Sequence, residues 1–74
     1  MTAVRYHVEK KCPNNLGWTK VTFIESSNKA FCDGYVTAFD SMYPSDPYRI
    51  VKTDKDGNTK VVRETKGNGS VHLN

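Results

Sequence analysis

An acidic loop is the part of this sequence closest to a metal-binding motif. The stretch DKDGN (residues 54–58) places aspartates at alternate positions before a glycine, as calcium-binding loops do. With Gly57 at the sixth position of such a loop, Lys52 falls on the first position and Arg63 on the twelfth. Calcium loops need carboxylates at both of those positions. Because cations replace them, we interpret the loop as a hairpin turn and assign it no metal.

The cysteines and histidines stand apart from one another along the chain. Cys12, Cys32, His7 and His72 lack the short paired spacing of a structural zinc site, so no metal or other cofactor is expected. A Cys12 nucleophile served by His7 is excluded because five residues of extended strand separate the two by about 17 Å. The serines lack the strand, sharp turn and helix that position a nucleophile. No catalytic residue is predicted, and the protein is not expected to be an enzyme.

Basic side chains are the remaining candidates for a functional site. The chain has 11 Lys and Arg against 8 Asp and Glu, a formal net charge of +3, which favours anionic partners but is weaker than a typical DNA-binding domain shows. Most of these cations fall on predicted strands, so we expect one sheet face and its edges to be positive and the helix side to be neutral or weakly acidic. Such side chains also keep an open sheet from aggregating, and the sequence leaves both roles open. The candidate partner-binding residues are Arg5, Lys11, Lys20, Arg49, Lys52, Lys60 and Arg63.

Two strands are predicted before a helix. Residues 3–11 alternate apolar and polar side chains, the period of a strand with one buried face. The Pro- and Asn-rich residues 12–17 predict a turn, and the aromatic and β-branched residues 18–25 predict the second strand. Because Phe23 does not share the parity of Trp18, this strand needs a β-bulge or packing on both of its sides.

An amphipathic helix is predicted next. Residues 26–28 (SSN) supply adjacent N-cap candidates, and Pro44 ends the helix because it forces the preceding residue out of the helical conformation. Gly34 disfavours the helix by about 1 kcal/mol relative to Ala, so we expect it to permit a close approach to the sheet. Apolar residues at spacings of three and four are expected to form the stripe that faces the sheet. This stripe consists of Phe31, Gly34, Tyr35, Ala38 and Met42.

The second half of the chain predicts a hairpin and a tail. Residues 48–52 and 59–65 have strand composition, and Asp56-Gly57 between them is a strong hairpin signal. Residues 66–74 contain two glycines and no period, which predicts a mobile tail. The fold class is therefore α+β: a single small domain of residues 1–65 with the order β-β-α-β-β and one helix packed on a largely antiparallel sheet. Most of the eight aromatic side chains are expected in its core.

Composition also bears on location. Hydrophobic residues make up 36% of the chain and the mean hydropathy is -0.66. The first residues lack the apolar region of a secretion signal, and no apolar run approaches the length of a membrane span. A cytoplasmic protein that does not bind membranes is expected.

A set of structural residues gives this layout a familiar appearance. They are Trp18 and Phe23 in a strand, Ala30, Tyr35 and Ala38 in a capped helix, the Tyr43-Pro44 stop, and YRIV at residues 48–51. The chain resembles, over residues 4–62, the small β-β-α-β accessory proteins common in phage and prophage genomes. The resemblance implies host takeover or evasion of defence by occluding a surface of a larger host protein, as anti-CRISPR proteins and polymerase inhibitors do. It assigns no binding residues, and the chain lacks the strongly acidic surface of DNA-mimic inhibitors.

Two function hypotheses follow. The first is a phage-type interaction protein, an inhibitor or adaptor, that binds a host or viral protein through its sheet face and hairpin. The alternative is a non-specific nucleic-acid-binding protein whose basic sheet face contacts the phosphates of DNA or RNA. The sequence leaves the oligomeric state open.

Overall fold

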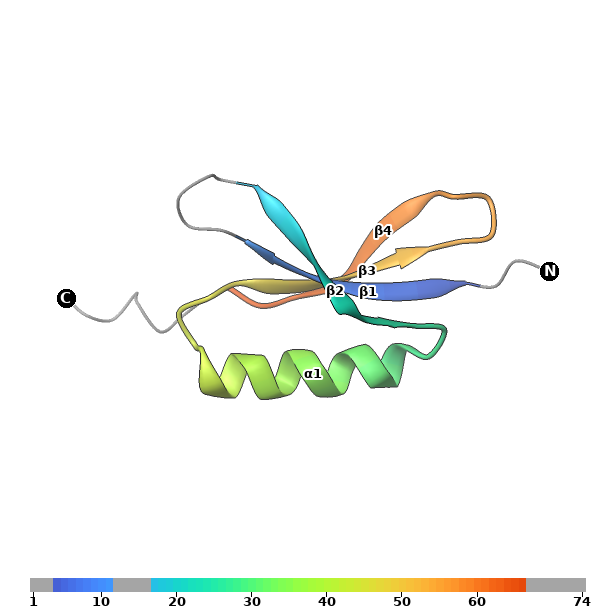
Figure 1. Cartoon of the computed structure of the whole chain (residues 1–74). Coiled ribbons are helices and arrows are strands. Elements are labelled where there is room, and N and C mark those ends of the chain that lie inside the picture. The colour runs from blue at the N-terminus through green and yellow to red at the C-terminus, as the bar shows by residue number, and fades with distance from the viewer. Residues whose placement is uncertain (1–3, 12–16, 67–74) are drawn as a thin grey trace.

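The computed structural model of the chain describes residues 4–11 and 17–66 and has the predicted β-β-α-β-β order (Figure 1). The turn expected at residues 12–17 lies almost wholly outside the described residues, as does the tail from residue 67 onward. Across the described part, no helix is long and apolar enough to cross a membrane. The elements are β1 (Arg5–Lys11), β2 (Trp18–Ser26), α1 (Lys29–Met42), β3 (Tyr48–Thr53) and β4 (Thr59–Glu64).

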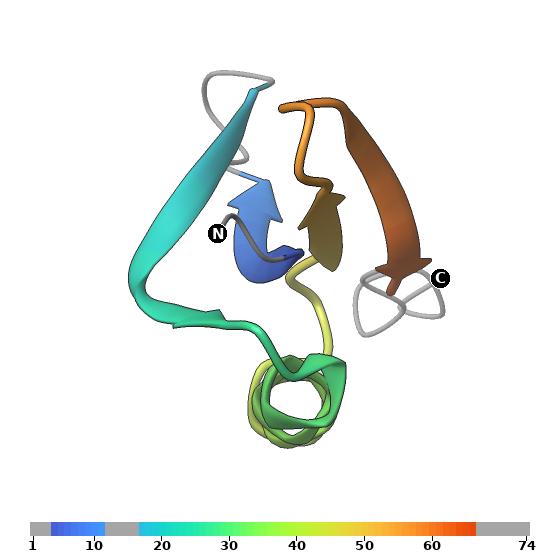
Figure 2. The same cartoon turned by 90° about the vertical axis from the view of Figure 1, so that its right-hand side faces the viewer.

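The four strands form one antiparallel sheet in the order β2-β1-β3-β4. The two central strands, β1 and β3, come from the first and second halves of the chain, and α1 connects the two halves while packing on one face of the sheet. In the view along the helix, α1 lies on one side of β1 and β3, and β2 and β4 flank them (Figure 2). Among the described residues, no helix lies over the opposite face of the sheet, and we call it the open face.

The helix begins and ends where the sequence predicts. Asn28 is the N-cap with an extended backbone, and its side-chain oxygen accepts a 2.9 Å hydrogen bond from the backbone N–H of Ala30. At the other end, the N–H of Tyr43 donates to the carbonyl of Phe39 at 2.7 Å before Pro44 breaks the pattern. Local side-chain chemistry therefore fixes both ends of α1.

The side of α1 that faces the sheet differs from the predicted stripe. Cys32 and Val36 are fully buried and Phe39 packs against them, which places positions i, i+4 and i+7 on the core side. The stripe expected there is turned away by about a quarter of the helix circumference, since successive residues are about 100° apart. Its residues Phe31 and Tyr35 are 42% and 37% exposed. The prediction that this stripe faces the sheet is therefore wrong.

Gly34 does not mediate a close approach to the sheet. A Cβ atom added at Gly34 would meet nothing within 4 Å, so the residue faces open space on the outer side of α1. The expectation that most aromatics occupy the core also fails, because Tyr48 is the only one of the eight that is buried. Small aliphatic and thiol side chains fill the core instead. It consists of Val8, Ile24, Cys32, Val36, Tyr48 and Ile50.

A bulge in β2 resolves the parity conflict between Trp18 and Phe23. His7 pairs with Glu25, yet the next residue, Val8, pairs with Val21, so residues 22–24 have no partner on β1. The extra residues rotate the strand so that Ile24 is fully buried while Phe23 beside it is 71% exposed. Of the two alternatives that the sequence left open, the structure has the bulge, and it places a large apolar side chain on the surface.

The hairpin between β3 and β4 has a loop of residues 54–58. The backbone N–H of Asp54 donates to the carbonyl of Asn58, and the N–H of Gly57 donates to the carbonyl of Asp54. Gly57 has φ +88°, a conformation that favours glycine. The Asp54 carboxylate accepts hydrogen bonds from the N–H groups of Asp56 and Asn58, at 2.9 and 3.0 Å. The aspartate that suggests a calcium loop thus stabilises the turn itself.

Candidate interaction surfaces

The predicted cations divide between the two faces of the sheet. Strand register places four of them on the open face and three on the face that carries α1, because directly paired residues point to the same side. The expectation of a single positive sheet face is therefore wrong. The open-face cations are Arg5, Lys11, Lys20 and Arg49, and those on the helix side are Lys52, Lys60 and Arg63.

Arg49 is the centre of a polar cluster on the open face. Its Nε donates to Oε1 of Glu9 at 2.7 Å, and its guanidinium carbon lies 4.3 Å from the ring centroid of Trp18. The other carboxylate oxygen of Glu9 lies 2.8 Å from Nε2 of His7. Trp18 is on β2, Glu9 and His7 are on β1 and Arg49 is on β3, so the cluster joins three strands. It holds an arginine and a tryptophan on a face that no other element within residues 4–11 and 17–66 covers.

Glu9 is held in its charged form. Burial acts to raise the pKa of its carboxyl, but hydrogen bonds from His7 and Arg49 outweigh burial and bring the pKa below its ordinary value. The Glu9 and Arg49 side chains are only 17% and 25% exposed. The charges of this pair are thus largely satisfied within the protein.

A second carboxylate, Glu25, pairs with the cations at the edge of the open face. Glu25 lies 3.4 Å from Arg5 and 3.3 Å from Lys20, and the Lys20 contact is the main cause of its lowered pKa. Lys11 alone among the predicted cations of this face forms no ion pair within residues 4–11 and 17–66. The open face is therefore a mixed surface in which most cations already have a carboxylate partner.

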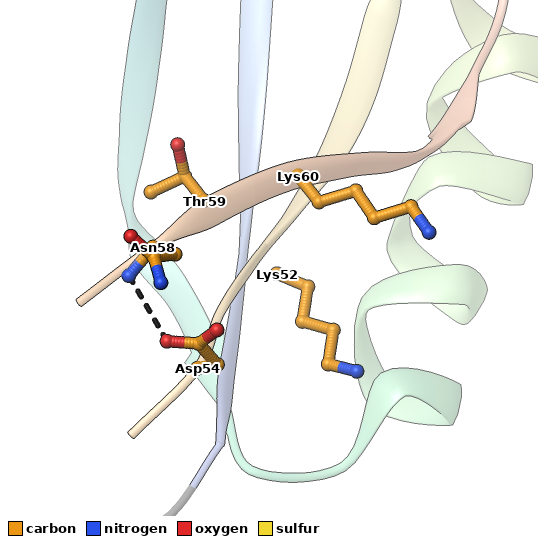
Figure 3. Close-up of a pocket in the computed structure, with 5 residues that line it drawn as sticks. All are labelled: Lys52, Asp54, Asn58, Thr59 and Lys60. Atoms are coloured by element: carbon orange, nitrogen blue, oxygen red, sulfur yellow. Dashed lines mark hydrogen bonds between the residues drawn. The ribbon is translucent and has the colours of Figure 1, made fainter. Parts of the chain in front are cut away.

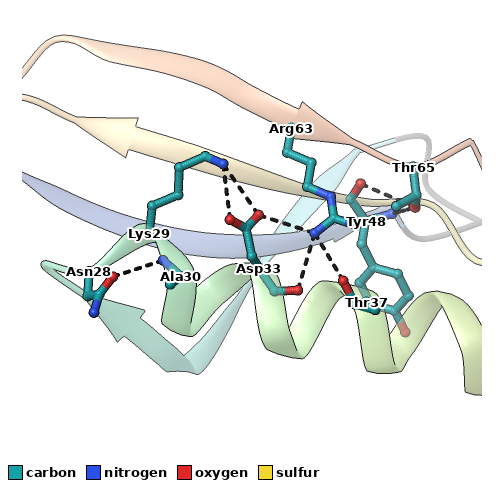
Figure 4. A network of polar contacts seen from close by, with 8 residues as sticks. All are labelled: Asn28, Lys29, Ala30, Asp33, Thr37, Tyr48, Arg63 and Thr65. Carbon is teal, nitrogen blue, oxygen red and sulfur yellow. Dashed lines mark hydrogen bonds and ion pairs between the residues drawn. The ribbon is translucent and has the colours of Figure 1, made fainter.

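Arg63 has a structural position on the helix side (Figure 4). Its Nη1 lies 3.1 Å from Oδ1 of Asp33 and 3.2 Å from the hydroxyl of Thr37, both on α1. Lys29 also binds the Asp33 carboxylate, at 3.1 Å, and is the largest cause of the lowered pKa of Asp33, with Arg63 adding to it. The guanidinium that was predicted to face a partner thus joins β4 to the helix.

Lys52 and Lys60 lie directly opposite each other on β3 and β4. Figure 3 shows both side chains extending in the same direction from the hairpin, beside a hollow that Asp54, Asn58 and Thr59 also line. Neither lysine forms an ion pair with any residue that the structure describes. Because like charges directly opposite each other on neighbouring strands repel, this pair is the best-placed group to receive an external anion.

An exposed apolar surface lies on the side of α1 next to β2, away from the side where Arg63 of β4 binds the helix. It is formed by Phe23 and Met42, 71% and 58% exposed, together with Phe31 and Tyr35, 42% and 37% exposed. The ring centroid of Tyr35 is 5.1 Å from that of Phe31 and 6.4 Å from that of Phe23, so the three rings are in contact. We call these four residues the aromatic flank. The sequence analysis placed Phe31, Tyr35 and Met42 in the stripe that faces the sheet. It therefore did not predict that they form an exposed surface.

The described residues hold no metal-binding or nucleophilic cluster. Within them, no group of three or more His, Cys, Asp or Glu side chains lies close enough to hold a metal ion. Cys32 is fully buried, and burial raises the pKa of its thiol, which disfavours the reactive thiolate. The surfaces available for function are therefore the open face, the lysine pair and the aromatic flank.

Comparisons of this chain with protein-family models, with curated proteins and with solved structures found no match.

Proposed function

We propose that the protein is a small non-enzymatic interaction protein that binds another protein through the open face of its sheet. The observation that carries the proposal is Arg49, stacked on Trp18 at 4.3 Å and bound to Glu9 at 2.7 Å in the middle of a face that α1, the one helix of the described residues, leaves uncovered. Tryptophan and arginine supply much of the binding energy of protein interfaces, and side chains already held in place lose little entropy on binding.

Charge balance favours a protein over a nucleic acid as the partner of this face. Glu9 and Glu25 already engage three of its four predicted cations, whereas a phosphate-binding surface needs cations free to replace counterions. A partner with both charged and apolar groups suits such a mixed surface. Because the layout resembles that of phage accessory proteins, we propose a host or viral protein in a bacterial cell as this partner.

The test is affinity capture from a bacterial lysate followed by mass spectrometry. Wild type is compared with Trp18→Ala, with Arg49→Ala, and with Lys55→Ala at the exposed hairpin tip as the matched control. We expect one specific set of proteins to be retained by wild type and by Lys55→Ala. Recovery should fall about tenfold or more with Trp18→Ala and Arg49→Ala, the loss typical of interface anchors. Retention of the same set by all four proteins would contradict the proposal.

The pair of Lys52 and Lys60 favours a second candidate, binding to the phosphates of DNA or RNA. Both ammonium groups lack a carboxylate partner in the described chain, and both lie on the side of the sheet away from the open face. A gel-shift series from low to physiological salt tests this candidate. Affinity should fall by about 0.9 log units per phosphate contact for each log unit of salt. It should also fall in the double variant Lys52→Ala/Lys60→Ala; absence of binding at every salt concentration ends this candidate.

A further inference from the structure

The aromatic flank is a contiguous apolar surface on a very small domain. Phe31, Tyr35 and Met42 project from one side of α1 at spacings of four and seven, and the bulge in β2 places Phe23 beside them. Packing within the chain leaves all four more than a third exposed. A soluble monomer rarely exposes contiguous apolar side chains over such an area unless they contact another molecule.

A shallow groove of small residues runs next to these side chains on the outer surface of α1. Ala30, Gly34 and Ala38 follow one another at intervals of four, and the hollow is bordered by the rings of Phe31 and Tyr35. Gly34 is the least favourable of these residues for a helix, and no contact within the described residues requires it, since its Cβ position faces open space. A glycine here does, however, leave room for another helix to come close to the backbone of α1.

The side chains of Phe31 and Tyr35 form a ridge that lies beside the groove, which makes the surface complementary to itself. Ridges of residues four apart pack into the matching grooves of a second helix when the two helices cross obliquely. A two-fold axis beside Gly34 therefore places the Phe31 and Tyr35 rings of each copy against the small residues of the other. No third component is needed to fill either groove.

Area and charge also suit a second copy. From their exposed fractions, the four side chains of the aromatic flank offer about 400 Å² per copy, and with the exposed groove residues a pair can bury about 1,000 Å², which is the lower limit of specific interfaces. None of the seven residues is charged, and the nearest helix charges, Lys29 and Asp33, bind each other on the β4 side. Two copies can thus meet here without burying an unpaired charge.

We propose that the protein forms a two-fold symmetric dimer in which the aromatic flank and groove of α1 in one copy pack against the same surface of a second copy. This interface is separate from the open face through which we propose that the protein binds its partner. Because α1 and the open face lie on opposite sides of the sheet (Figure 2), the dimer directs its two open faces outward.

Sedimentation equilibrium of the purified full chain, from micromolar to millimolar concentration, tests the proposal. We expect a reversible monomer–dimer equilibrium. Its dissociation constant should rise about tenfold or more in Gly34→Leu, which fills the groove, and in Phe23→Gln, which removes an aromatic ring from the aromatic flank. Asp40→Asn, on the β4 side of the helix, is the matched control and should dimerise as wild type does. Circular dichroism establishes that each variant is folded. A wild type that stays monomeric, or whose dimer survives both Gly34→Leu and Phe23→Gln, overturns the proposal.

Cross-linking locates the interface independently. In a Cys12→Ser background, whose remaining native thiol, Cys32, is buried, Gly34→Cys should give a disulfide-linked dimer under mild oxidation, whereas Asp40→Cys should not. Equal cross-linking at the two positions, or none at position 34, also overturns the proposal. If wild type is monomeric and the flank instead binds a different protein, a second copy is the wrong partner.

Discussion

Arg63 and Asp33 connect the edge of the sheet to the helix. Nη1 of Arg63, on β4, lies 3.1 Å from the carboxylate oxygen Oδ1 of Asp33 and 3.2 Å from the backbone carbonyl oxygen of the same residue, on α1. The backbone of α1 lies close to the other three strands, and β4 adds Val62 at the border of the core, so this polar contact supplements the core where the helix and β4 meet. The two side chains are 33% and 34% exposed, which limits but does not abolish the strength of the pair.

Replacing Arg63 by methionine should lower the free energy of unfolding by about 1 to 2 kcal/mol. Methionine keeps much of the apolar stem of arginine but removes the charged hydrogen bonds to Asp33 and Thr37. Urea denaturation followed by circular dichroism measures the difference. Lys60→Met on the same strand is the matched control, because Lys60 has no ion pair among the described residues, and its effect should stay within about 0.5 kcal/mol. Similar losses for both variants would show that Arg63 contributes only its stem.

Stability should depend on pH through the Glu9 cluster. Burial acts to raise the pKa of Glu9, yet the hydrogen bonds from His7 and Arg49 leave it below the ordinary value of 4.5. A carboxyl whose pKa is lower in the folded state contributes its full stabilisation above the unfolded-state pKa and loses it as the pH falls through the folded-state pKa. We therefore expect the free energy of unfolding to fall as the pH is lowered below about 4.5.

Glu9→Gln isolates this contribution. The variant keeps the shape of Glu9 but loses its titratable charge, so it should be less stable than wild type near neutral pH and should approach wild type in acid. Urea denaturation at a series of pH values gives both curves. Glu25→Gln, at the exposed edge of the open face, is the control. It should reduce the pH dependence of the free energy of unfolding less than Glu9→Gln does. Parallel curves for wild type and Glu9→Gln would exclude Glu9 as a source of the pH dependence.

Replacing Gly34 and Gly57 by alanine should change the free energy of unfolding in opposite directions. Gly34 is in a helix with open space at its Cβ position, so Gly34→Ala should stabilise the monomer by up to about 1 kcal/mol. Gly57 has φ +88°, a conformation that alanine tolerates poorly, so Gly57→Ala should destabilise by about 1 kcal/mol. Denaturation at low protein concentration, where dimers do not contribute, measures both. Changes of the same sign would contradict the assigned backbone conformations.

Local signals predicted the elements of this fold well. The N-cap at Asn28, the stop at Pro44 and the turn glycine Gly57 act within a few residues of sequence, and each marks the boundary that the structure has. The orientation of α1 was not predictable in this way. The helix carries two apolar rows, Cys32 with Val36 and Phe31 with Tyr35, and only packing against the sheet selects the smaller pair.

The residue types of the candidate site could be predicted from the sequence, but the ion pairs that those residues form could not. Arg49 and Arg63 both follow from strand composition, but the carboxylates that bind them, Glu9 and Asp33, are 40 and 30 residues away in the sequence. Their proximity depends on strand register and on the bulges, which the sequence specifies only through the assembled core. The division of cations between two faces was therefore beyond sequence reasoning.

The bulge in β2 yields the sharpest test of the fold, because it gives two neighbouring apolar residues opposite environments. Ile24 is fully buried in the core, so Ile24→Ala should lower the free energy of unfolding by about 2 to 5 kcal/mol. Phe23 is 71% exposed, so Phe23→Ala should cost less than about 1 kcal/mol despite removing the larger side chain. Urea denaturation at low protein concentration measures both variants, and a regular alternating strand without the bulge would not bury Ile24 on the side of Val21. A larger loss for Phe23→Ala than for Ile24→Ala would mean that the strand presents its other face to the helix.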